Sequence, residues 1–234
     1  MDKNYAKNLL NKTTYDYNFI AEQFSSAREI IWPEFSFLFT DFLVPGDKIL
    51  DIGCGNGRFS ELCKEKAFYF GIDNSEELIK IAKNRYPEAN FQKADALRLP
   101  FFDNSFNKVY SIAVFQHIPS KEFRQQFLNE AKRVLKPGGF LFLTAWNLWR
   151  WNNIKILIKN SILKVFGLSK LDFKDFFLSS QGSLFKDFYY HAFTKKELEG
   201  LIRRSGFKVE KSGLITRSSG KKRHSNFYII AQKI

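Results

Sequence analysis

The sequence is poor in cysteine, in uninterrupted apolar runs and, over its last two-fifths, in acidic residues. Its two cysteines, Cys54 and Cys63, are too few for a disulfide framework, and neither lies in a cluster with metal-ligand spacing. We therefore expect a reducing compartment and no metal site. No stretch approaches the roughly 18 apolar residues of a membrane span, and the first residues lack a signal peptide's apolar core. These absences predict a cytoplasmic protein with no membrane span.

Charge is distributed unevenly along the chain. Residues 1–140 carry 19 lysines and arginines against 18 acids, whereas residues 141–234 carry 18 against 6, so nearly all of the net charge of +13 lies in the second part. Clustered cations raise the local potential and gain free energy by releasing counterions from a polyanion. The distribution predicts nucleic acid as a partner. Solvated charge runs and an anionic membrane surface are the alternatives.

Strand-like and helix-like segments alternate through the middle of the chain. The expected strands are 48–52, 68–72, 89–93, 106–112 and 139–145, followed by 206–214 and 226–232, and the expected helices between them are 57–66, 75–85 and 120–135. Such alternation favours right-handed βαβ units with helices on both faces of a parallel sheet. We predict an α/β fold: a Rossmann-like, doubly wound, mostly parallel seven-stranded sheet.

The length of 234 residues suits one such domain with elaborations. We divide it into an N-terminal helical cap (1–44), a cofactor-binding core (45–146), an insertion that covers the substrate (147–192), and a C-terminal helix with a strand hairpin (193–234). The insertion contains an amphipathic stretch at Asn153–Phe166, and the hairpin turns through a basic segment at 217–224. The active site is expected between the core and its two flanking elaborations.

An apolar strand runs directly into three glycines at every second position, Gly53, Gly55 and Gly57. Side chains there would block the approach of a ligand or forbid positive φ, and the next helix would direct its N-terminus at that ligand. The pattern predicts a nucleotide-like cofactor, with a tight turn that binds nothing as the alternative. Because Gly57 follows Gly55 by two residues, not by the three of dinucleotide-binding turns, an amino acid's carboxylate and amine suit it better than a pyrophosphate.

Acidic side chains follow three of the predicted strands. Asp73 ends the second strand, where a carboxylate can accept both hydroxyls of a ribose, and Asn74 lies beside it. Asp95 follows the third strand and would accept from an adenine amino group. The small side chain of Ala96 would let the protein wall lie close to the adenine. In the alternative interpretation, Asp95 is a solvated loop acid. Asp51 ends the first strand and is expected to face the charged end of the cofactor, unless it is a turn carboxylate satisfied by its neighbours.

Together these segments resemble the class I S-adenosylmethionine-dependent methyltransferases over about residues 45–145. The residues that carry the resemblance are Asp51-Ile-Gly53-Cys-Gly55-Asn-Gly57, Asp73, Ala94-Asp95-Ala96 and Leu135-Lys-Pro-Gly-Gly139. The resemblance implies S-adenosylmethionine as the cofactor, bound by the glycines and acids named above and by Ile112 at the end of the fourth strand. It also implies that the last strand joins the sheet antiparallel.

The flanks resemble a narrower family, the tRNA wobble-uridine carboxymethyl methyltransferases, which esterify 5-carboxymethyluridine in the anticodon. The similar segments are 15–33, 111–117, 145–146 and 189–193. This resemblance implies tRNA as the substrate, contacted by the basic C-terminal region, and a small zinc-binding activator protein as a partner. It implies an acceptor pocket lined by Arg28, His117 and Trp146, with Tyr190 and His191 beside them.

Each acceptor-pocket residue has an expected role. Arg28 would hold the carboxylate or a phosphate, while His117 and Trp146 would pack against or hydrogen-bond the uracil. His117 could also act as a base near neutral pH, although a carboxylate is already ionised there and needs none. In the alternative interpretations Arg28 pairs with Glu22 or Glu29 on a surface helix, and His117 is an end group of a helix or loop.

Two other functions remain open from the sequence. One is a methyltransferase for a small molecule such as a quinone precursor, since such enzymes share the pattern of residues 45–145. The other is a non-catalytic cofactor-binding or membrane-surface protein that uses the lysine-rich stretch at Asn153–Phe166.

Overall fold

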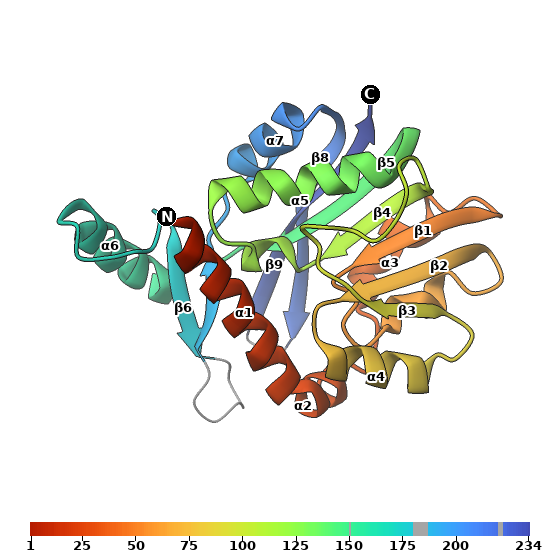
Figure 1. The fold of residues 1–234 in the computed structure, drawn as a ribbon, viewed down its shortest axis with the longest axis horizontal. Helices are drawn as coiled ribbons and strands as arrows, with labels where there is room; N and C mark the ends of the chain where they lie inside the picture. Colours follow the sequence, from red (N-terminus) through yellow and green to blue (C-terminus); the bar gives the residue numbers. More distant parts are fainter. Residues whose placement is uncertain (150, 180–186, 220–221) are drawn as a thin grey trace.

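The computed structural model describes residues 1–149, 151–179, 187–219 and 222–234. Its centre is a seven-stranded sheet of order β3-β2-β1-β4-β5-β9-β8 (Figure 1). Its strands are β1 (Asp47–Ile52), β2 (Ala67–Asp73), β3 (Asn90–Lys93), β4 (Phe106–Ile112), β5 (Leu135–Trp146), β8 (Phe207–Ser219) and β9 (Lys222–Lys233). The first five strands pair in parallel, and β9 runs antiparallel to both of its neighbours. The predicted Rossmann-like fold with an antiparallel last strand is confirmed.

Helices cover both faces of the sheet. One face packs against α5 (Lys121–Val134) and α7 (Lys195–Arg204), and the other against α3 (Pro33–Thr40), the 3₁₀ helix η1 (Arg58–Leu62) and α4 (Glu76–Arg85). The predicted helix at 75–85 and the predicted C-terminal helix both form, and each begins at a capping side chain: Ser75 and Thr194 accept from a backbone N–H three residues on.

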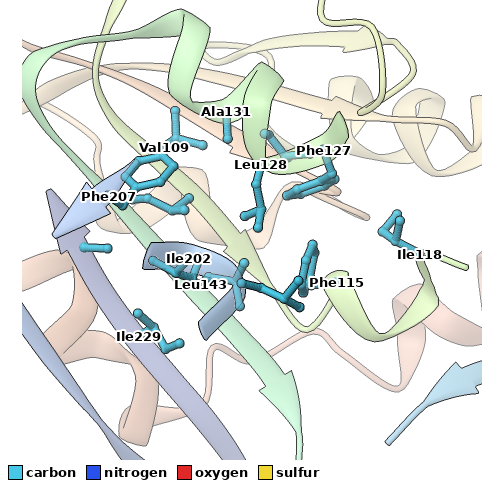
Figure 2. Packing of buried hydrophobic residues seen from close by; sticks show 14 of the residues in the cluster. Val109, Phe115, Ile118, Phe127, Leu128, Ala131, Leu143, Ile202, Phe207 and Ile229 are labelled. Carbon is cyan, nitrogen blue, oxygen red and sulfur yellow. The ribbon is translucent and has the colours of Figure 1, made fainter. Parts of the chain in front are cut away.

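The core on the first face is aliphatic and aromatic, and Figure 2 shows part of it. Phe127, Leu128 and Ala131 of α5 recur at helical spacing and are fully buried. They pack with Leu143 of β5 and Ile202 of α7. Burying one such large apolar side chain stabilises the fold by roughly 1.5–3 kcal/mol, so this layer fixes the strand ends from which the site is built.

The core on the second face contains a column of stacked rings. Phe39 of α3 lies 4.2 Å from Tyr110 of β4, and Tyr110 lies 4.5 Å from Phe142 of β5, between ring centroids. All three side chains are fully buried, and the Tyr110 hydroxyl donates to the Leu38 carbonyl at 3.0 Å. The column anchors α3, part of the predicted N-terminal cap, to the sheet.

The remaining elements lie near the carboxyl ends of the parallel strands (Figure 1). They are α1 (Lys3–Phe19), α2 (Ala21–Ser26), α6 (Trp151–Val165), a small antiparallel sheet of β6 (Asp175–Ser179) and β7 (Asp187–His191), and the short 3₁₀ helix η2 (Phe115–His117). The sequence predicted helices for the first and third of these, but no strands within 147–192. Among the described residues, no helix is both long and apolar enough to cross a bilayer.

The predicted helix at 57–66 is wrong in type and length, because the chain forms only the short 3₁₀ helix η1 there. Lys66 and Ala67 donate to the Cys63 carbonyl, and Glu65 adopts a left-handed φ of 65°, so the chain turns early into β2. The predicted hairpin strands are too short, since β8 and β9 extend to Ser219 and from Lys222. The centre of the predicted basic turn, residues 220–221, lies outside the described residues.

Gly57 offers a test of this local packing. Its φ is +77°, and an added Cβ would lie 2.6 Å from Phe91 Cζ and 3.0 Å from Ala82 Cβ. We expect Gly57→Ala to lower the free energy of unfolding by about 2–4 kcal/mol, through left-handed strain and overpacking together. Gly167→Ala is the matched control, because φ is +72° there with no atom within 4 Å, and strain alone costs about 1–2 kcal/mol. Urea unfolding followed by tryptophan fluorescence measures both; equal losses would contradict the packing role.

Candidate cofactor and acceptor site

A cavity lies at the carboxyl ends of β1, β2 and β4, where ligands bind in open parallel sheets. Its empty volume is about 1210 Å³ when the open solvent at its mouth is included. The N-terminal helices and the turn after α2 supply one wall, with Leu10, Thr13, Thr14, Tyr17, Phe24 and Arg28. The described part of 147–192 contributes no lining residue and packs behind that wall, with Tyr190 against Trp146 and His117.

The three glycines of the turn serve two purposes. Gly53 and Gly55 line the cavity with φ of +78° and +57°, and a Cβ on Gly53 would collide with Val114. The backbone at these two positions borders the cavity, and the missing Cβ of Gly53 leaves the room that Val114 occupies. Gly57 does not line the cavity, since its free space is taken by Phe91 and Ala82. The predicted cofactor contact at Gly57 thus falls where the structure shows packing.

Asp73 is held at the cavity wall by the turn itself. Its Oδ2 accepts from the Gly55 N–H at 3.0 Å and its Oδ1 from the Ser75 N–H at 2.9 Å. Burial raises the pKa of this carboxyl, and the Ser75 and Gly55 N–H groups oppose the rise. A carboxylate oxygen accepts more than one hydrogen bond, so both oxygens can still accept from the two hydroxyls of a ribose.

The other predicted cofactor residues extend the same wall. Asn74, Asp95, Ala96 and Ile112 all line the cavity. Asp95 is exposed, and its Oδ1 accepts from the Leu97 N–H at 2.8 Å, which leaves Oδ2 available. Asn74 donates to Thr14 Oγ1 on α1 at 2.7 Å, so it also ties the N-terminal helix to this edge. The donor and acceptor set fits the ribose and adenine of S-adenosylmethionine.

Asp51 lies behind the turn and does not line the cavity. It is buried and accepts from the Tyr69 hydroxyl at 2.5 Å, while its Oδ1 has no hydrogen-bond partner. Burial raises the pKa of Asp51 to about 7. Its contact with the charged end of the cofactor, expected from the sequence, remains a prediction.

Arg28, His117 and Trp146 come from three separate segments and meet in the cavity wall. The Arg28 guanidinium lies over the Phe24 ring, 4.1 Å from its centroid. No carboxylate of a described residue lies within ion-pair distance of Arg28, so the alternative pairing with Glu22 or Glu29 is not formed. A half-buried cation that faces a cavity without an acid partner is a site for an anionic group.

Tyr190 and His191 point to opposite sides of β7, as neighbours on a strand must. The Tyr190 ring stacks on Trp146 at 5.5 Å and 21°, which braces the indole from behind. His191 is buried in an ionic cluster instead, with Nδ1 2.6 Å from Asp175 and Nε2 3.0 Å from Glu197. Neither residue lines the cavity: Tyr190 packs behind Trp146 and His117, and His191 lies further away in the ionic cluster.

His117 is buried with both ring nitrogens engaged. Nδ1 lies 3.1 Å from the Tyr189 carbonyl and Nε2 lies 3.0 Å from the Tyr17 hydroxyl. Burial lowers the pKa of His117 to about 4, so the ring is uncharged near neutral pH. These contacts disfavour the predicted role as a base and favour a role in orienting its neighbours.

The depressed pKa of His117 makes a specific prediction about stability. As pH falls below 6.5 the unfolded chain protonates this histidine first, so its contribution to stability is lost progressively between pH 6.5 and about 4. The difference in unfolding free energy between wild type and His117→Gln should shrink by about 1.4 kcal/mol from pH 7.5 to 5.5. Asp51 titrates in both proteins and cancels in that difference. A difference independent of pH would contradict a neutral, buried His117.

Several lining residues were not predicted as site residues, among them Tyr17, Phe24, Trp32, Asn56 and Arg58. Tyr17, Phe24 and Trp32 lie within the flank segment 15–33, whose similarity to the tRNA methyltransferases was the available signal. Asn56 and Arg58 hold that segment in place, since both side chains donate to the Arg28 carbonyl, at 3.2 and 3.3 Å.

Comparison with known proteins agrees with this geometry. Residues 50–143 match the family described as methyltransferase domain. A tRNA (carboxymethyluridine(34)-5-O)-methyltransferase of Arabidopsis thaliana is 39% identical over 130 residues, 56% of this chain and 31% of that protein. This chain thus spans about a third of that curated relative.

Solved structures show the same fold over most of the chain. A SAM-dependent methyltransferase of Methanosarcina mazei is 27% identical, with a TM-score of 0.72 over 87% of this chain and 98% of that one. A methyltransferase of Haloferax volcanii, solved with the Trm112 activator, is 17% identical, with a TM-score of 0.65 over 94% of this chain and 96% of that one; this likeness concerns the fold alone.

The sheet order, the glycine turn beside Asp73 and the match over residues 50–143 all point to a methyltransferase domain. Residues 50–143 match a methyltransferase domain, and the chain resembles the class I S-adenosylmethionine-dependent methyltransferases and, among them, the tRNA carboxymethyluridine methyltransferases.

Proposed function

We propose that the protein methylates the carboxylate of 5-carboxymethyluridine at the wobble position of a tRNA. The observation that carries this proposal is Arg28, a cation in the cavity wall with no carboxylate of the described residues to pair with. It lies in the same cavity as the glycine turn and Asp73. The Arabidopsis relative, a tRNA (carboxymethyluridine(34)-5-O)-methyltransferase, supports the same substrate.

For this methyl transfer, the protein mainly has to place the methyl donor and the carboxylate in the correct geometry. When bound, S-adenosylmethionine supplies a methyl group on a sulfonium, which a carboxylate oxygen accepts to give a methyl ester and S-adenosylhomocysteine without proton transfer. A carboxylate is already ionised near pH 7, so no base has to be found. Arg28 would orient the anion and keep it desolvated, and Trp146, braced by Tyr190, would provide a flat face for the uracil.

The partners remain part of the proposal. Residues 141–234, with 18 lysines and arginines against 6 acids, would contact the phosphates of the tRNA. A small zinc-binding activator is proposed as a second partner, because the resemblance of the flanks to the tRNA methyltransferases implies one. The Haloferax protein of the same fold was solved with the Trm112 activator. Co-expression with such an activator would show its effect on yield and activity.

Incubation of the pure protein with labelled S-adenosylmethionine and total tRNA tests the proposal. After digestion to nucleosides, we expect the label in the methyl ester of 5-carboxymethyluridine. A parallel incubation with a lipid extract serves the alternative of a quinone-precursor methyltransferase. Label in that extract and none in the tRNA would overturn the proposed function in favour of a small-molecule substrate.

A further inference from the structure

Tyr17 of α1 and His117 form a polar pair in the cavity wall. Both residues line the cavity, and the Tyr17 hydroxyl lies 3.0 Å from His117 Nε2. His117 Nδ1 lies 3.1 Å from the backbone carbonyl of Tyr189 on β7. The pair therefore forms a chain of hydrogen bonds that begins at a strand backbone and ends at the cavity.

The direction of every hydrogen bond in this chain is determined. A backbone carbonyl can only accept, so the proton of the neutral imidazole must be on Nδ1. His117 Nε2 then has a lone pair and no proton, and the Tyr17 hydroxyl must donate its only proton to it. What Tyr17 Oη has left are lone pairs, so it can only accept a hydrogen bond from a ligand.

The residues around Tyr17 and His117 maintain these hydrogen-bond directions. Burial raises the pKa of Tyr17 to about 12 and lowers that of His117 to about 4, so neither ionises near neutral pH. The Tyr17 ring packs against Phe24 at 5.4 Å and Phe188 at 5.1 Å. The backbone of Tyr189 is held by the pairing of β7 with β6. The side-chain hydroxyl of Tyr189 accepts a hydrogen bond from Arg124 at 3.0 Å.

An obligate acceptor selects among bases. The imino N3 of uracil carries a proton, whereas N3 of cytosine presents a lone pair that would oppose the lone pairs of Tyr17. A site built to receive a hydrogen bond rejects an analogue that cannot supply it, because the buried polar atom is left unpaired. Trp146, stacked on Tyr190, offers the ring face on which a base could lie beside this acceptor.

We propose that Tyr17 is the specificity-determining residue that accepts the N3–H of the target uracil, with His117 as the positioning residue that turns its hydroxyl. The inference rests on the proposed function and deepens it, by assigning base recognition to a pair distinct from Arg28. It predicts that the enzyme distinguishes uracil from cytosine by the ring edge, independently of the carboxylate.

Two anticodon stem-loops that differ only in the wobble base, 5-carboxymethyluridine or 5-carboxymethylcytidine, test the proposal with wild type, Tyr17→Phe and a control. For wild type we expect kcat/KM to be at least about 30-fold higher on the uridine loop, from one unpaired buried acceptor. Tyr17→Phe should lose about 10–100-fold on the uridine loop, change little on the cytidine loop, and bring the ratio close to one. Tyr15→Phe, an exposed tyrosine on the same helix, should keep the wild-type ratio.

Each other outcome has a separate meaning. A wild-type ratio retained by Tyr17→Phe would overturn the assignment while leaving the proposed function intact. A rise in the Kd for S-adenosylmethionine in Tyr17→Phe, measured by calorimetry without RNA, would overturn it by placing Tyr17 against the cofactor's ammonium group. A wild-type enzyme that methylates neither loop would overturn the proposed function and, with it, this inference.

Discussion

Asp73→Asn is expected to raise the Kd for S-adenosylmethionine by about 100-fold. The carboxylate accepts one backbone N–H on each oxygen and faces the cavity, so it is positioned for both ribose hydroxyls. The asparagine has one acceptor oxygen and no charge, and its amide must oppose either a backbone N–H or a hydroxyl proton. Two charge-assisted hydrogen bonds at roughly 1.5 kcal/mol each account for that loss. Isothermal calorimetry on the purified variants measures it.

The matched control is Asp95→Asn. Asp95 lines the same wall but is exposed, and one of its oxygens already accepts from Leu97 N–H. A single solvent-screened contact predicts a loss of about tenfold or less. If both variants bound the cofactor equally, or if Asp95→Asn were the weaker binder, the ribose assignment of Asp73 would have to be abandoned. Thermal unfolding of each variant separates loss of binding from loss of the turn.

Arg28→Ala is expected to lower kcat/KM for the tRNA by about 100- to 1000-fold, with the Kd for S-adenosylmethionine unchanged. Removing one partner of a desolvated, hydrogen-bonded charge pair costs roughly 2–5 kcal/mol. A loss of about 3–4 kcal/mol in transition-state stabilisation corresponds to the expected fall in kcat/KM. Arg28 is half-buried over Phe24, so the guanidinium is already partly desolvated and oriented before a substrate arrives. Single-turnover methylation of tRNA with saturating cofactor gives the rate.

Arg85→Ala is the matched control for Arg28→Ala. Arg85 also lies over an aromatic ring, 5.7 Å from the centroid of Tyr86, but at the exposed end of α4 and outside the cavity lining. Its removal should change kcat/KM by no more than a few-fold. Arg28→Lys should retain part of the activity, because the charge stays while the bidentate geometry is lost. Full activity in Arg28→Ala would show that the anion is held elsewhere.

Much of the fold could be predicted from local patterns. The spacing of Gly53 and Gly55 after an apolar strand, and of Asp73 at the end of the next, has one simple structural solution, in which strand ends meet at one edge of a parallel sheet. Capping residues such as Ser75 and Thr194 determine helix starts through contacts only three residues apart. Most predictions that depended on short-range chemistry were therefore confirmed, and the helix predicted at 57–66 is the exception.

What could not be predicted depended on contacts between distant segments. Gly57 was assigned to the cofactor by its place in the turn, but the side chain that occupies its free space is Phe91 on β3. His191 was placed beside the acceptor pocket by the resemblance of segment 189–193, whereas the partners that hold it outside the cavity are Asp175 and Glu197.

The protonation of His117 shows the same limit. A histidine in a sequence has an unperturbed pKa near neutrality, which allowed the interpretation as a base. Its actual state follows from burial, from the Tyr189 carbonyl 72 residues away and from the Tyr17 hydroxyl 100 residues away. No periodicity or motif carries that information, and so Tyr17 was not predicted as a site residue.

The central claim is that a methyl group is placed on the carboxylate of a wobble uridine. The most direct measurement uses an anticodon stem-loop with a single 5-carboxymethyluridine and S-adenosylmethionine labelled in the methyl group, followed by mild alkali. We predict that one label per RNA is incorporated and that alkali releases all of it as methanol, with none incorporated into the same loop carrying unmodified uridine. Label that survives alkali, or that enters the unmodified loop, would contradict the account.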